Sequence, residues 1–171
     1  MVQTKRSFAK IFTLTASVLM LAGSFIDDGL WHELGAVKGC GIVERLCYPV
    51  VHASPLHALV NVWCLISVVF MYGITPWRLL IAYITAAAVP DFALSSEMPT
   101  VGLSTMCYAL LGSLSWEVRR KIYFQAWMAF YIGVGFLFPN VNAMIHVYGY
   151  AAGLLVGFLN APVSCVKRSQ R

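Results

Sequence analysis

The chain has 171 residues, of which 60% are hydrophobic and only 11% are charged. A soluble domain carries about 25% charged residues, so this composition excludes an ordinary soluble fold and predicts a membrane protein that crosses the bilayer several times. The net charge of +5 lies in short clusters between apolar runs, which is typical of membrane orientation rather than of nucleic-acid binding.

The apolar runs, taken in chain order, predict an all-α membrane protein with six transmembrane helices in one domain, residues 1–171. The first run follows Lys5, Arg6 and Lys10 and could be read as a signal peptide, but its end is a weak cleavage site. We therefore expect it to be retained as a helix. The expected helices span residues 8–26, 56–72, 76–89, 101–116, 122–137 and 141–159.

Residues 27–55 form the longest polar stretch, yet this loop also contains Trp31 and Tyr48. Because Trp and Tyr favour the boundary between lipid and water, we expect the loop to lie partly in the membrane interface. Its two cysteines, Cys40 and Cys47, can form a disulfide in an oxidising compartment or stay reduced. No pair of cysteines in the chain has C-x-x-C spacing.

Basic residues predict the orientation of the six helices. With an even number of spans, both termini and the loops after the second and fourth helices lie on one side. Because Lys and Arg accumulate on the cytoplasmic side, we expect both termini to be cytoplasmic, in a plasma (inner) membrane. The cytoplasmic side then carries Lys5, Arg6, Lys10, Arg78, Arg119, Arg120, Lys121, Lys167, Arg168 and Arg171, and the outer side carries Lys38 and Arg45.

Three of the expected helices begin on the outer side, and each has polar residues near that end. Ionisable groups within a membrane are costly, usually face the interior of the helix bundle, and often mark function. We therefore expect these groups to meet at one depth below the outer surface. They are His52, His57 and Asn61 on the second helix, Ser104 on the fourth, and Asn140, Asn142 and His146 on the sixth.

These residue types fit nucleophilic catalysis. Ser104 can attack a carbonyl if His146 accepts its proton. His57 and Asn61 are four residues apart on one helix face, where both can donate hydrogen bonds to an oxyanion. Tyr108 lies one turn after Ser104, where its ring can stack on an imidazole.

Glycines repeat every four residues along the last helix, at Gly149, Gly153 and Gly157. Such spacing lets two helix backbones approach closely in lipid. We expect this helix to pack against the fourth one, with Gly112 receiving the contact and His146 brought to Ser104.

Other interpretations exist for each residue. A serine in an apolar helix commonly bonds its own backbone carbonyl, and histidine or asparagine can simply join helices. A zinc protease is disfavoured because His52 and His57 are five apart and the three helices contain no Asp or Glu. A transporter is disfavoured because the chain shows no internal repeat.

The same residues form three motifs, in order and on alternate helices. They are His52-x4-His57-x3-Asn61, Gly102-x-Ser104 followed by Tyr108, and His146-x-x-Gly149-x-x-x-Gly153. In this arrangement the chain resembles the rhomboid intramembrane serine proteases from about residue 44 to residue 159.

The resemblance implies a six-helix bundle with an interfacial first loop and a serine endopeptidase that needs no cofactor or metal. Ser104 would be the nucleophile and His146 the base, with His57, Asn61 and the Ser104 N–H as the oxyanion hole. Gly102, Tyr108, His52 and Gly149 would support them. Substrates would be membrane proteins cut within or beside a transmembrane helix, near the outer face. The oligomeric state stays open.

Two positions depart from the family pattern. Glu44 replaces the tryptophan of the usual Trp-Arg pair in the first loop, leaving Arg45, and Thr105 replaces the glycine that usually follows the serine. A β-branched residue stiffens and crowds this turn, so we expect an altered rate or selectivity. The alternative function is a catalytically impaired rhomboid-like protein that binds transmembrane helices.

Overall fold

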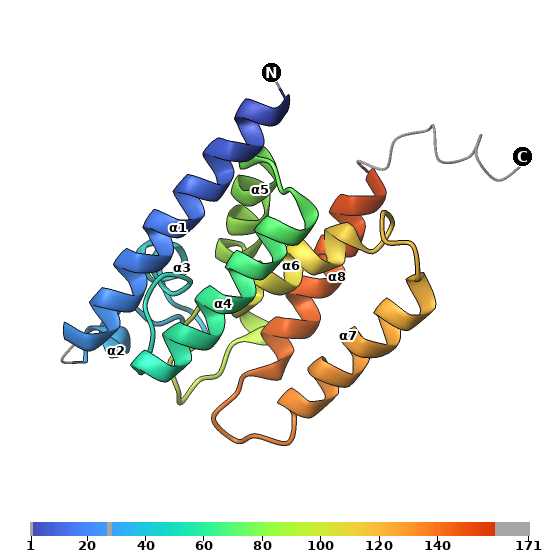
Figure 1. The fold of residues 1–171 in the computed structure, drawn as a ribbon. Helices are drawn as coiled ribbons and strands as arrows, with labels where there is room; N and C mark the ends of the chain where they lie inside the picture. Colours follow the sequence, from blue (N-terminus) through green and yellow to red (C-terminus); the bar gives the residue numbers. More distant parts are fainter. Residues whose placement is uncertain (1, 27–28, 160–171) are drawn as a thin grey trace, which may run out of the picture.

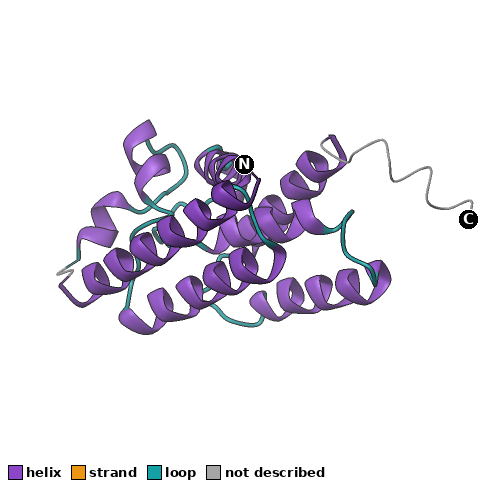
Figure 2. Ribbon diagram, turned by 45° about the horizontal axis from the view of Figure 1, so that its top comes forward, coloured by secondary structure: helices purple, strands orange, loops and turns teal. Residues whose placement is uncertain are grey.

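A computed structural model of the protein describes residues 2–26 and 29–159, and helices dominate this part of the chain (Figures 1 and 2). The only β pairing within it is an isolated bridge between Ala36 and Thr100. The all-helical fold predicted from the sequence is therefore confirmed. The helices are α1 (Val2–Ile26), α2 (Leu30–Leu34), α3 (Ile42–Cys47), α4 (Pro55–Tyr72), α5 (Pro76–Ala87), the 3-10 helix η1 (Asp91–Ala93), α6 (Ser104–Leu114), α7 (Lys121–Gly135) and α8 (Ala143–Leu159).

Several boundaries differ from those expected. The first helix begins at Val2 instead of residue 8, and α6 begins at Ser104 instead of residue 101. The late start of α6 has a local cause, because Gly102 has a left-handed φ of 105° and interrupts the helical path. Two segments, Thr4–Ile26 and Pro55–Tyr72, are long and apolar enough to cross a membrane, whereas α6 and α8 are apolar but shorter.

Helix α6 is the centre of the bundle, whereas α7 is largely exposed. Eight of the eleven residues of α6 are buried, whereas α7 buries only Met128 and Gly135. In Figure 1, α6 lies between α4 and α8, and α7 lies beside α8 at the edge of the molecule. The residues that α6 carries are thus held by neighbours on several sides.

The loop before α4 folds against the segment between α5 and α6. The Ala36 and Thr100 backbones exchange two hydrogen bonds of 2.9 Å, and the Arg45 guanidinium contacts the Val89 carbonyl and the Asp91 carboxylate. Cys40 and Cys47 are both free thiols here. This loop is therefore tied to the start of α6 by backbone and ionic contacts, without a disulfide between its cysteines.

Some residues used in the sequence analysis lie outside the described part of the chain. They are Lys167, Arg168 and Arg171, together with residues 27 and 28 at the start of the polar stretch.

Acidification is expected to loosen this loop through Asp91. The Gly39 N–H donates to Asp91 at 3.3 Å, and this bond, together with the Arg45 guanidinium, holds the pKa of the carboxyl below its usual range. A carboxyl with a lowered folded-state pKa stabilises the fold above its unfolded pKa of about 4, and that contribution is lost as the pH falls further. Protection of the Gly39 amide from hydrogen exchange, corrected for intrinsic pH effects, should therefore fall below about pH 4.

Asp91→Asn should show the low protection at neutral pH as well. Glu97→Gln, which changes an exposed carboxylate between η1 and α6, serves as the control and should keep the wild-type pH dependence. Wild-type protection that did not change with pH would contradict this role of Asp91.

Candidate active site

The first turn of α4 presents His57 and Asn61 on one face. Ser54 caps the helix, because its hydroxyl accepts the His57 N–H at 3.2 Å, and Pro55 occupies the first turn, where its missing N–H costs nothing. Asn61 is buried and its amide donates to the His57 carbonyl at 3.1 Å. These contacts fix the Asn61 side chain and the helix start that carries His57.

Gly102 brings the chain that precedes Ser104 directly against these two side chains. A Cβ atom on Gly102 would lie 2.8 Å from His57 Nε2 and 3.1 Å from Asn61 Nδ2, closer than side chains normally approach. Its φ of 105° is also strained for any other residue. Glycine is thus required at position 102 for two reasons, the close contact and the left-handed φ. Ser104 begins α6 two residues later and is half-buried.

His146 enters the same region from α8. Its ring stacks on Tyr108 of α6, with 4.5 Å between ring centroids and 27° between planes. Its Nδ1 is buried and has no hydrogen-bond partner within the described residues. The Tyr108 ring therefore orients this imidazole, and Tyr108 lies one helical turn after Ser104 on the same helix face.

Close packing of α6 on α8 holds the histidine in place. A Cβ on Gly149 would lie 2.6 Å from the Thr105 carbonyl oxygen and 3.1 Å from its Cγ2, and a Cβ on Gly153 would overlap the Ala109 carbonyl. Gly112 makes the reciprocal contact with the Tyr150 carbonyl. The glycine spacing predicted this close approach of the two helices. Gly149 faces Thr105 and Gly153 faces Ala109, so α6 and α8 run parallel to each other.

Thr105 is fully buried, and its methyl group occupies space that the missing side chain of Gly149 leaves open. The crowding that we expected from a β-branched residue beside Ser104 is therefore directed at α8, where a glycine accommodates it.

The His52 ring contacts the His57 ring. His52 is buried, and the two rings meet edge to face with centroids 5.3 Å apart. This places the third histidine of the region within the same cluster. Within the described residues, no group of three or more His, Cys, Asp or Glu side chains could hold a metal ion.

The contacts described above place the starts of α4, α6 and α8 side by side, as the sequence motifs require. A family model described as "Rhomboid domain" matches residues 40–163, which is most of the chain. This chain belongs to the rhomboid family. The resemblance found in the motifs is thereby confirmed. No curated protein matches the chain.

Membership in the rhomboid family, a family of intramembrane proteases that act on membrane proteins in the bilayer, makes the chain a membrane protein. The matched residues include α3 to α8, and α1 and α2 precede them. Every residue of the three motifs lies inside the match.

Two residues that the motifs do not include support this candidate site. Tyr48 is fully buried, and its carbonyl accepts the Gly102 N–H at 2.8 Å while its phenol donates to the Ala86 carbonyl. Asn142, just before α8, donates to the Ala93 carbonyl and the Thr100 hydroxyl at 2.8 and 3.0 Å. Tyr48 was expected at the membrane interface and is instead fully buried, because its partners are distant in the chain and cannot be read from its neighbours in sequence. Asn142 was predicted as a polar residue at a helix start.

Proposed function

We propose that this protein is an intramembrane serine protease that cuts the transmembrane or juxtamembrane segment of membrane protein substrates near the outer membrane face. The observation that carries the proposal is the packing of Gly102 on His57 and Asn61, joined to the stacking of His146 on Tyr108. Ser104 lies between these two contacts in the sequence, two residues after Gly102 and four before Tyr108. We further propose six membrane spans within a single domain, an interfacial first loop, and both termini in the cytoplasm beneath the plasma (inner) membrane.

The proposed reaction needs no cofactor. Ser104 Oγ attacks the scissile carbonyl as His146 takes its proton, and the Ser104 N–H, His57 and Asn61 stabilise the oxyanion. His146 then protonates the leaving amine, and water hydrolyses the acyl-enzyme in a second attack assisted by the same imidazole. The absence of acidic residues from α4, α6 and α8 supports a serine–histidine pair in place of a three-residue relay.

Labelling with a fluorophosphonate probe tests this proposal. Such a probe reacts with a serine only when a base activates it. Purified wild-type protein should be labelled, and Ser104→Ala should not. Because folding must be shown separately, the helical circular dichroism and thermal midpoint of each protein are measured in the same detergent.

A second candidate is a rhomboid-like protein that binds transmembrane helices without cutting them. Thr105 favours it, because it stands where the family pattern usually has a glycine, even though Gly149 accommodates its methyl group. Folded wild-type protein that is not labelled would contradict the protease and support this candidate. Thr105→Gly would then be the first variant in which to look for recovered labelling.

A further inference from the structure

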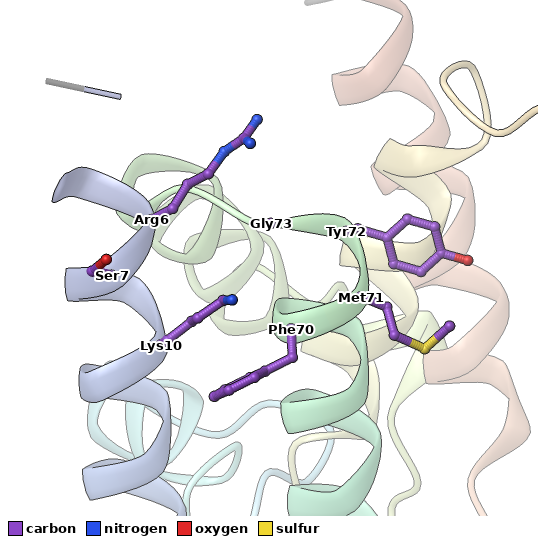
Figure 3. A pocket seen from close by; sticks show the side chains of 7 residues that line it. All are labelled: Arg6, Ser7, Lys10, Phe70, Met71, Tyr72 and Gly73. Atoms are coloured by element: carbon purple, nitrogen blue, oxygen red, sulfur yellow. The ribbon is translucent and has the colours of Figure 1, made fainter. Parts of the chain in front are cut away.

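A cavity of about 400 Å³ lies between the start of α1 and the end of α4. Arg6, Lys10 and Phe70 point into this space, whereas the side chains of Met71 and Tyr72 extend away from it (Figure 3). Phe70 is 13 residues beyond His57 on α4, which corresponds to about 20 Å along a helix. The cavity is therefore separate from the candidate active site and lies at the opposite end of α4.

Two positive charges on one face of α1 line this cavity. Arg6 and Lys10 are one helical turn apart, and Lys10 Nζ lies 4.8 Å from the centroid of the Phe70 ring. The Arg6 guanidinium lies beside Gly73, where a Cβ atom would be 3.4 Å from Arg6 Nε. Within the described residues, neither cation forms an ion pair with a carboxylate.

The C-terminus of α4 only partly compensates the positive charges of Arg6 and Lys10. A helix C-terminus carries the equivalent of about half a negative charge, so it attracts cations but does not neutralise two of them. The ring of Phe70 adds a cation–π contact without adding a negative charge. The cavity thus keeps an excess of positive charge that a bound anion would balance.

The position of the cavity along the membrane normal indicates which anion can reach it. Arg6 is 20 residues from Ile26, the last residue of α1, and this length of helix spans about 30 Å, the thickness of the hydrocarbon core. With Ile26 at one boundary of the hydrocarbon, Arg6 lies at the other, beside the phospholipid headgroups. Lys10 lies one turn, about 6 Å, further inside, and its long side chain can extend toward the same headgroups. Basic pockets between transmembrane helices at this level are suited to anionic headgroups.

We propose that Arg6 and Lys10 bind the phosphate group of an anionic phospholipid, which holds the start of α1 against the end of α4. Helix α1 precedes the residues that the family model matches, so family membership does not assign this site. The proposal is independent of protease activity, and its test has no activity readout.

The test is titration of the full-length protein, in a non-ionic detergent, with short-chain phosphatidylglycerol and with phosphatidylcholine of the same chain length. We expect phosphatidylglycerol to bind more tightly, and Arg6→Gln and Lys10→Gln each to weaken its binding about fivefold. Lys5→Gln is the matched control, since it removes the same charge from an exposed residue of α1 that does not line the cavity. Its affinity should stay within about twofold of wild type.

Three results would overturn the proposal: equal binding of the two lipids, equal weakening by Lys5→Gln, or inorganic phosphate binding as tightly as phosphatidylglycerol. The last result would assign the cavity to a soluble phosphate compound. Arg6→Lys, which keeps the charge, should retain most of the affinity, and thermal midpoints measured without lipid separate lost binding from lost folding.

Discussion

Replacement of Ser104 or of His146 by alanine is expected to lower the rate of substrate cleavage by at least about 10⁴-fold. In the proposed reaction Ser104 supplies the attacking oxygen, and His146, held by the Tyr108 ring, is the only imidazole stacked on α6 within the described residues. Because the two groups act in one step, the double variant should be no slower than the slower single variant. The measurement is initial cleavage of a fluorescent single-span substrate in proteoliposomes.

Two control variants separate this loss of activity from a general loss of folding. Ser96→Ala and His32→Ala change the same residue types at exposed positions in loops or short helices, and both should cleave at close to the wild-type rate. If Ser104→Ala cleaved as fast as the parent, another group would be the nucleophile. Additive losses in the double variant would show that Ser104 and His146 act in separate steps.

A methyl group added to Gly153 is expected to separate α6 from α8. The new Cβ would overlap the Ala109 carbonyl, which belongs to helix backbone and cannot rotate away. Overpacking of this kind typically costs about 1–3 kcal/mol. The free energy of unfolding of Gly153→Ala should therefore be lower than that of the wild type by about 1–3 kcal/mol or more. Because His146 precedes Gly153 on the same helix, cleavage should fall as well.

Gly133→Ala is the matched control on α7. A Cβ there would meet nothing within 4 Å, so the exchange should be neutral or stabilise the helix by up to about 1 kcal/mol. Reversible unfolding in mixed micelles with increasing dodecyl sulfate measures both variants. Equal stability of the two would mean that α6 and α8 do not depend on close backbone contact.

The sequence predicted most of the fold because lipid exposure makes helices visible as long apolar runs. The start of α6 was misplaced by three residues, since hydropathy does not register the left-handed turn at Gly102. The short helices α2 and α3 were not predicted either, because each has fewer than seven residues and depends on tertiary contacts.

For the candidate site, spacing along each helix was sufficient to predict which residues share a face. His57 with Asn61, and Ser104 with Tyr108, are both four residues apart. The supporting contacts could not be predicted in this way. Tyr48 reaches Gly102 across 54 residues of chain, and Thr105 fits only because the facing residue is Gly149.

The parallel glycine contact between α6 and α8 also has a consequence for biosynthesis. The chain emerges from the ribosome in order, so α6 emerges before α8, the helix against which it packs. During that interval Thr105 and Ala109 lack the backbone of α8 that later covers them. Ser104 and His146 therefore cannot meet until α8 has emerged, and the newly made protein lacks the complete candidate site until then.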